Sequence, residues 1–356
     1  MPFKYAGKTS RPKKEKVTLL MRSEKIFHVI FAEQFDRQVL DFLCRLATQL
    51  RKIAKSREGI DFLHSLLSHK SAMLYFTQPS TRTFLSFVRA CQYLGMDYGE
   101  VRDPNISSFY KGESEMDGVR TFSSYFDLII MRHHEGGLAE KAAYMLNDTP
   151  RPIPVISGGA GSDEHPTQAL LDVYTLQRSF EERQGGIEGI HVAFIGDVAR
   201  GRTVRSLVKL LALYDNIKIT FVSPAELSIR DDIRSWLDRK KTPYAETTDF
   251  REIIKEADAF YVTRIQDEYD GAIKSSEIDY GPFKLTLEDV QEMKPAAIIM
   301  HPLPRRDELD PRIDLDRRAI YWRQERNGMW IRSALMAYIF NMESRILDYY
   351  SEHYKY

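Results

Sequence analysis

The chain has 356 residues, 43% hydrophobic and 29% charged, and its 51 basic side chains balance 51 acidic ones. The length suits about two globular domains, and the balanced charge argues against nucleic acid as a partner. No apolar run approaches the ~18 residues of a membrane span, so no membrane contact is expected. The two cysteines, Cys44 and Cys91, suggest neither a disulfide framework nor a metal cluster, which favours a reducing compartment. We therefore expect a cytoplasmic protein.

The first residues are rich in basic side chains. Residues 1–16 hold six basic residues and one acid, with prolines at positions 2 and 12. A targeting peptide and a flexible tail both fit this composition, and the lysines and prolines favour the tail. We expect residues 1–24 to form a flexible basic extension.

Strands and helices alternate along the rest of the chain. In the first part, apolar spacing predicts helices at 35–53, 84–94, 119–125 and 138–146 and strands at 71–76, 127–131 and 153–156. In the second part it predicts strands at 190–195, 217–222, 259–262 and 297–300 and helices at 201–213, 227–239, 250–257, 287–293 and 333–349. The polar stretch 99–114 is expected to be irregular. This alternation predicts an α/β protein with two doubly wound parallel-sheet domains that meet near residue 180.

Polar side chains follow six of the predicted strands. They are Ser80 to Thr83, Arg132, His165, Asp197 to Arg202, Arg264 with Gln266, and His301 to Pro304. Ligands of open α/β sheets bind beyond the carboxyl ends of the strands. Six such ends rich in Arg, His, Gln and hydroxyl groups, with few acids, predict a site for an anionic substrate.

The segment Ser80-Thr81-Arg82-Thr83 has two explanations when taken alone. It stands where a helix begins, so its hydroxyls suit ordinary helix capping. The same amides, hydroxyls and guanidinium would also bind a phosphate group. The segment itself does not decide between them.

Five blocks in this order resemble a known family. They are Ser80-Thr81-Arg82-Thr83, His165-Pro166-Thr167-Gln168, Gly201-Arg202-Thr203, Thr263-Arg264-Ile265-Gln266 and His301-Pro302-Leu303-Pro304. Together they resemble the signature blocks of the aspartate and ornithine carbamoyltransferases, and the resemblance runs from about Ile26 to the C-terminus. The late block lacks the Cys typical of the ornithine branch, and the sequence has no Ser-Met-Gly segment. Guanidinium groups such as Arg202 and Arg264 suit the two carboxylates of aspartate.

The resemblance implies transfer of the carbamoyl group of carbamoyl phosphate to L-aspartate, giving N-carbamoyl-L-aspartate and phosphate in pyrimidine biosynthesis. The implied carbamoyl phosphate residues are Ser80, Thr81, Arg82, Thr83, Ser107, Lys111, Arg132, His165, Gln168, Pro302 and Leu303. Those implied to be catalytic are Arg82, Thr83, Lys111, Arg132, His165 and Gln168. The implied aspartate residues are Lys111, Arg202, Arg264, Gln266 and Leu303. We expect no metal and no cofactor.

The resemblance also implies an organisation. We expect a carbamoyl phosphate domain at 25–180 plus 321–356, an aspartate domain at 181–320, the active site between them, and a C-terminal helix that returns to the first domain. Ser107 and Lys111 resemble a loop that enters a neighbouring subunit's site, which implies a homotrimer, although spacing alone would make Lys111 a solvated loop residue. Further assembly with a regulatory chain or a dihydroorotase stays open. So do two other functions: transfer to another amine such as ornithine, and a non-catalytic pathway scaffold.

Some residues depart from the family pattern or stand outside it. Gln78 replaces a glutamate common in aspartate enzymes, and Phe84 and Val88 replace a charged pair with an expected apolar contact. His133-His134-Glu135 is not expected to bind a metal, since adjacent side chains diverge. Arg200 is interpreted as a helix-surface or interdomain charge.

Overall fold

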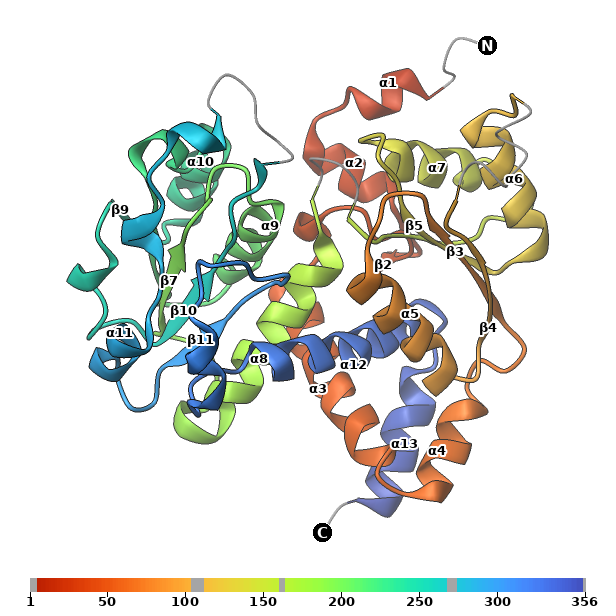
Figure 1. Ribbon diagram of the computed structural model, residues 1–356. Coiled ribbons are helices and arrows are strands. Elements are labelled where there is room, and N and C mark those ends of the chain that lie inside the picture. Colours follow the sequence, from red (N-terminus) through yellow and green to blue (C-terminus); the bar gives the residue numbers. More distant parts are fainter. Residues whose placement is uncertain (1–4, 104–111, 160–163, 268–273, 355–356) are drawn as a thin grey trace. The chain divides into compact units, whose positions relative to one another are not determined.

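The computed structural model describes residues 5–103, 112–159, 164–267 and 274–354 (Figure 1). The chain forms two compact units, Met1–Leu170 with Gly328–Tyr356, and Leu171–Asn327. The observed boundaries therefore lie near 170 and 327, compared with the expected 180 and 320.

The first unit is built on a four-stranded parallel sheet of order β4-β3-β5-β6. The strands are β3 (Ser71–Phe76), β4 (Asp97–Val101), β5 (Leu128–Arg132) and β6 (Val155–Ser157). Its helices are α3 (Arg37–Ile53), α4 (Arg57–His64), α5 (Thr81–Tyr93), α6 (Glu115–Tyr125), α7 (Leu138–Asn147) and α13 (Glu343–His353). Met73, Tyr75, Ile129 and Met131 share one face and pack with apolar residues of α6 and α7. Strands buried on both faces explain why these segments read as continuous apolar runs.

The second unit is built on a five-stranded parallel sheet of order β11-β10-β7-β8-β9. The strands are β7 (His191–Ile195), β8 (Lys218–Val222), β9 (Tyr244–Thr247), β10 (Ala259–Val262) and β11 (Ile298–Met300). The helices are α9 (Arg202–Leu211), α10 (Asp231–Lys240) and α11 (Leu287–Glu292), with short 3₁₀ turns such as η5 (Phe250–Glu252). Two longer helices, α8 (Pro166–Gln184) and α12 (Tyr321–Ile339), contribute residues to both units. The prediction of an α/β protein with two parallel sheets is confirmed.

The C-terminal part of the chain belongs to the first unit, as predicted. The expected single helix at 333–349 is two helices, because α12 ends at Ile339 and α13 begins at Glu343. Asn341 lies between them with φ +59°, a left-handed conformation that asparagine tolerates. Helix α13 packs on α3. No helix in the described ranges is long and apolar enough to cross a membrane.

Residues 5–26 differ from the expected flexible extension. They form α1 (Ala6–Thr9), α2 (Lys13–Leu19) and a hairpin of β1 (Met21–Arg22) and β2 (Lys25–Ile26). Leu20 is fully buried in the core of the first unit. The lysines pair with acids elsewhere in this unit: Lys8 with Asp148 at 3.1 Å and Lys16 with Glu140 at 3.0 Å. Complementary acids distant in sequence thus order a segment whose composition alone suggests disorder.

The edges of each sheet are of two kinds. Val29 forms a parallel bridge with Ile156 of β6, and Ala319 forms one with Ile299 of β11. The opposite edges are the partly exposed strands β4 and β9. Neither β4 nor β9 was predicted, because edge exposure removes the apolar run that marks the central strands.

Candidate functional site

The turn after β3 leads directly into α5. Ser80 is the N-cap residue of this helix, with extended backbone angles φ −165° and ψ 100°. Within the described part of the chain, the Ser80 side chain accepts no hydrogen bond from the first helical turn. Thr83, in that turn, is buried. Among the described residues, the start of α5 therefore has no side-chain cap from Ser80, and phosphate binding by this segment stays a prediction.

The departures from the family pattern lie around this turn. Phe84 and Val88 are both buried, and the Phe84 ring packs edge-on against Phe76 with ring centroids 5.4 Å apart. Both residues are thus buried as an apolar replacement would be, and the direct contact between Phe84 and Val88 stays a prediction. The backbone N–H of Gln78 donates to the Arg132 carbonyl at 3.2 Å, which ties the turn to the end of the neighbouring strand.

Arg132 is the last residue of β5 and pairs in register with Phe76 at the end of β3. Its side chain is buried, and Nη1 donates to the Gly158 carbonyl at 3.0 Å. The Gly158 N–H in turn donates to the Met131 carbonyl at 2.7 Å. A neutral backbone acceptor thus orients the Arg132 guanidinium at the carboxyl end of β5.

His165 and Gln168 open helix α8, and both are buried. His165 Nδ1 accepts a hydrogen bond from the Gln168 N–H at 3.3 Å. A neutral imidazole that accepts at Nδ1 carries its proton on Nε2, so His165 can donate from that atom. Gly159 has φ +82°, and a Cβ there would lie 2.6 Å from His165 Cδ2. A glycine is therefore required where the backbone passes the imidazole.

Ser107 and Lys111 lie outside the described residues. The chain resumes before α6, whose first residue Glu115 accepts a hydrogen bond from the buried Tyr75 hydroxyl. His133 Nε2 lies 3.2 Å from the same carboxylate, and its Nδ1 accepts from the Glu135 N–H at 3.0 Å. Both ring nitrogens of His133 are therefore engaged within the protein.

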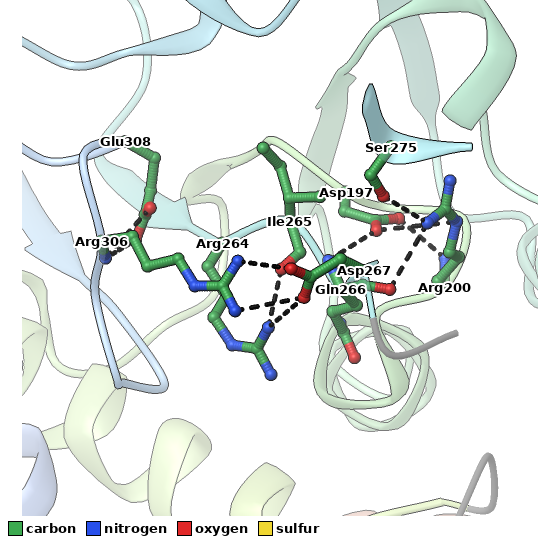
Figure 2. A network of polar contacts seen from close by, with 9 residues as sticks. All are labelled: Asp197, Arg200, Arg264, Ile265, Gln266, Asp267, Ser275, Arg306 and Glu308. Atoms are coloured by element: carbon green, nitrogen blue, oxygen red, sulfur yellow. Dashed lines mark hydrogen bonds and ion pairs between the residues drawn. The ribbon is translucent and has the colours of Figure 1, made fainter. Parts of the chain in front are cut away.

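In the second unit, Asp197 connects the ends of β7 and β10 (Figure 2). This fully buried carboxylate accepts from the Gln266 N–H and the Arg200 N–H, each at 3.1 Å. Burial raises the pKa of Asp197, and these two amides and the Arg200 charge oppose that rise. The backbone at Gly196, after β7, lies close to the backbone at Thr263, after β10. Only glycine fits there, because a Cβ on residue 196 would lie 2.3 Å from the Thr263 carbonyl oxygen. Gln266 is thus positioned by a buried acid.

Arg200 lies ahead of α9 and is not a helix-surface charge, whereas the alternative of an interdomain charge stays a prediction. Its side chain is only 6% exposed, and Nη1 donates to Ser275 Oγ at 2.9 Å (Figure 2). Asp197, three residues earlier, was the sequence signal for this buried pair. Arg202 is the first residue of α9 and is partly exposed.

Arg264 follows β10 and lies beside Asp267 (Figure 2). Arg264 Nη1 donates to the Ile265 carbonyl at 2.7 Å and lies 3.7 Å from Asp267 Oδ1. Arg306 makes a bidentate pair with the same carboxylate, at 2.9 and 3.1 Å. A carboxylate therefore already contacts the guanidinium that the sequence assigned to substrate carboxylates.

The block His301-Pro302-Leu303-Pro304 follows β11. His301 is fully buried; its Nδ1 accepts from the Leu303 N–H and its Nε2 contacts Glu308, each at 2.8 Å. Burial alone would raise the pKa of Glu308, but the His301 hydrogen bond and the Arg306 N–H hold it below its usual value. Leu303 has φ +51°, which is strained for leucine, and its bond to His301 helps to hold it.

Two family models match the chain. Residues 28–178 match the aspartate/ornithine carbamoyltransferase carbamoyl-P binding domain, and residues 188–339 match the Asp/Orn binding domain of the same family. The chain belongs to the aspartate/ornithine carbamoyltransferase family, which confirms the resemblance seen in the sequence.

Individual relatives are aspartate enzymes. The chain is 42% identical to the chloroplastic aspartate carbamoyltransferase of Arabidopsis thaliana, over 89% of this chain and 78% of that protein. It is 40% identical to the chloroplastic enzyme of Oryza sativa, over 88% of this chain and 85% of that protein. Among solved structures, it is similar to Trypanosoma cruzi aspartate transcarbamoylase in complex with carbamoyl aspartate and phosphate. That match has a TM-score of 0.77 and 33% identity, over 88% of this chain and 96% of the other.

These relatives contradict the expected cytoplasmic location. The Arabidopsis and Oryza proteins are named as chloroplastic, which points to a plastid. The expectation failed because two reduced cysteines fit any reducing compartment and do not distinguish one from another.

Within each unit, several residues that neighbour the candidate site residues were not predicted from the sequence. They are Lys13, Gly159, Glu164, Asp267 and Arg306. Of these residues, Glu164 had the clearest signal in the sequence, since it is an acid directly before His165 in a segment expected to bind an anion. The partners of Lys13 and Arg306 lie far away in sequence, and no spacing rule connects them.

Proposed function

We propose that this protein transfers the carbamoyl group of carbamoyl phosphate to the amine of L-aspartate, giving N-carbamoyl-L-aspartate and phosphate in pyrimidine biosynthesis. Its family membership and its aspartate-specific relatives support this function. One observation carries the choice of aspartate over ornithine: the individual relatives, at 40% to 42% identity, are aspartate carbamoyltransferases. The Arg202 and Arg264 guanidinium groups suit the two carboxylates of aspartate, although Asp267 already offsets part of the Arg264 charge.

In the proposed reaction, the first unit binds carbamoyl phosphate. Ser80, Thr81, Arg82, Thr83 and Arg132 hold the phosphate. Thr83, Arg132 and His165 donate to the carbamoyl oxygen, where negative charge develops as the amine attacks. The His165 proton on Nε2, assigned from its Nδ1 contact, suits this role. Gln168 and the Pro302 and Leu303 carbonyls orient the carbamoyl NH₂ group.

In the second unit, the proposed aspartate residues are Arg202, Arg264, Gln266 and Leu303. The amine attacks the carbamoyl carbon and forms the C–N bond; the C–O bond to phosphate then breaks, and phosphate leaves with the electron pair and the proton that the amine gives up. No side chain becomes covalently attached, so positioning and electrostatic stabilisation supply the rate increase.

A steady-state assay tests this function. Purified protein should form carbamoylaspartate from carbamoyl phosphate and aspartate, and no citrulline when ornithine replaces aspartate. His165→Ala should lower kcat by roughly 10²–10³, the usual effect of losing one such donor. The exposed His69 serves as the control, and His69→Ala should keep full activity. Absence of carbamoylaspartate at millimolar substrates would favour another amine or a non-catalytic scaffold.

We also propose a homotrimer in which Ser107 and Lys111 complete the site of a neighbouring subunit. The support is the family resemblance, since both residues lie outside the described ranges. Lys111→Ala and Arg82→Ala should each be inactive, yet a mixture of the two should regain partial activity through hybrid trimers. Failure of the mixture to regain activity, with subunit exchange verified, would contradict shared sites.

For location, we propose a plastid, on the support of the chloroplastic relatives. A fluorescent fusion of the complete coding sequence, expressed in its source cells, should accumulate in plastids. A signal spread through the cytosol would contradict this proposal.

A further inference from the structure

Lys13 of helix α2 contacts the residue that directly precedes His165. Its Nζ forms ion pairs with both Glu33 and Glu164. The two carboxylate side chains are only 12% and 7% exposed. Lys13 lies ahead of the residues that match the family model, which begin at 28. The contact therefore joins the N-terminal segment to a signature block of the site.

Glu164 is fixed by two different partners. Besides the Lys13 ammonium at one oxygen, its Oε2 accepts from the Ala32 N–H at 2.7 Å. His165 follows directly in the chain, so the backbone position of Glu164 sets where the imidazole begins. The ring itself lies against Gly159. Both described ends of the segment from Gly159 to His165 are thus held in place.

The charges make Lys13 important for an anionic ligand. Glu164 and Glu33 would otherwise place two negative charges beside a residue proposed to contact carbamoyl phosphate. Burial lowers the pKa of Lys13, but the charges of Glu164 and Glu33 outweigh that effect and raise it above its usual value. Lys13 therefore stays protonated at neutral pH, and its positive charge offsets one of these two negative charges.

We propose that Lys13 is a positioning residue for carbamoyl phosphate binding: through Glu164 it holds His165 in place and cancels negative charge at the site. This inference rests on the proposed function. Lys13 itself touches no substrate and acts through its neighbour.

The main test compares two lysines of the same helix. Lys13→Met removes the ammonium that pairs with Glu164, whereas Lys16→Met removes the ammonium that pairs with Glu140, which is not adjacent to a site residue. Each change removes a lysine that pairs with a buried acid, so a purely structural role predicts similar effects. We expect Lys13→Met to raise the KM for carbamoyl phosphate roughly tenfold, the effect of one unscreened charge a few ångströms away, with a smaller change in kcat. Lys16→Met should change KM less than twofold.

Rescue variants separate charge from folding. Lys13→Arg should retain a low KM. In the double variant Lys13→Met/Glu164→Gln, the amide still accepts from the Ala32 N–H but carries no charge, so KM should return toward that of the parent. If Lys13→Met is too unstable to assay, Lys13→Gln gives the same comparison with a side chain that can still donate to Glu164. Calorimetric titration with inorganic phosphate gives a readout independent of turnover, and Lys13→Met should bind phosphate more weakly.

The outcomes are distinguishable. An inactive parent protein would overturn the proposed function. An active parent with equal KM values for Lys13→Met and Lys16→Met would overturn the role of Lys13 alone. So would a double variant whose KM stays as high as that of Lys13→Met.

Discussion

Arg132 and His165 in the first unit contact backbone groups, whereas Arg200 and Arg264 in the second unit lie beside carboxylates. Arg132 and His165 are only 8% and 4% exposed. Arg132 lies close to Gly158 and His165 lies close to Gly159, so their positions depend on these two glycines. In the second unit, Asp267 and Arg306 are 48% and 50% exposed. Activity should therefore be sensitive to changes of side-chain shape in the first unit, which matches the carbamoyl phosphate domain, and to changes of charge in the second unit, which matches the aspartate or ornithine domain.

Among the changes that test this contrast, the largest effect is expected from a methyl group beside His165. Gly159→Ala places a Cβ where the imidazole lies and adds strain at φ +82°. Displacement of a catalytic group by about 1 Å can cost about 10²-fold in rate, so we expect kcat to fall about a hundredfold. Gly185→Ala is the matched control: Gly185 has φ +80°, but a Cβ there would meet no heavy atom within 4 Å among the described residues. Equal activity of the two variants would show that shape does not govern this half.

The next effect concerns pH and the buried polar groups of the first unit. His28 is fully buried; its Nδ1 accepts from the Val155 N–H and its Nε2 contacts Asn147 Oδ1, each at 3.0 Å. Burial lowers the pKa of His28 to about 4, although the Asn147 contact opposes the change. In the unfolded chain, His28 binds a proton with a pKa near 6.5. The contribution of neutral His28 to the unfolding free energy is therefore fully present above that pH and is lost as the pH falls toward 4. We expect His28 to account for about 2 kcal/mol of lost unfolding free energy between pH 7 and pH 5.

Urea unfolding at the two pH values measures this loss. His28→Gln cannot titrate, so the difference between pH 7 and pH 5 should shrink even if the variant is less stable at both. The exposed His69 gives the comparison, and His69→Gln should leave the pH difference in place. An unchanged pH difference in His28→Gln would mean that another group carries the acid sensitivity.

The smallest effect tests the charge-dependent half. Arg306→Ala removes the bidentate partner of Asp267, so this carboxylate then competes with the substrate for Arg264. An exposed ion pair is worth up to about 1 kcal/mol, so the KM for aspartate should rise by about fivefold at most. The KM for carbamoyl phosphate should not change. Arg306→Lys keeps the charge and should show a weaker effect, and Asp267→Asn combined with Arg306→Ala should restore the parent value. A rise in both KM values would indicate a general disturbance of the protein.

The sequence predicted the buried strands well and the partly exposed edge strands β4 and β9 poorly. Strands such as Ser71–Phe76 and His191–Ile195 are buried on both faces, so they appear as apolar runs. Strand β4 carries exposed charges, and the expected helix at 250–257 contains only the 3₁₀ turn Phe250–Glu252. Short or half-exposed elements lack the periodicity on which such predictions depend.

The sequence predicted candidate site residues where one strand end supplies the residue, and it predicted no partners from distant segments. His165 and Arg264 were predicted from their blocks, whereas their neighbours Gly159 and Arg306 were not predicted. The pairing of Lys13 with Glu164 joins residues 151 positions apart. Only folding brings such distant charges together. A prediction from composition does not include these pairs, and for this reason we expected the N-terminal segment to be flexible.

The two kinds of sheet edge have a consequence for solubility. On one side, each sheet is capped by a short segment, at Val29 or Ala319, which takes up backbone groups of the last strand. On the other side, β4 exposes Asp97 and Glu100, and β9 exposes Glu246. A strand from another molecule would have to place its side chains against these acids, which opposes edge-to-edge aggregation. Replacing them with threonine should make concentrated protein prone to form intermolecular β-structure.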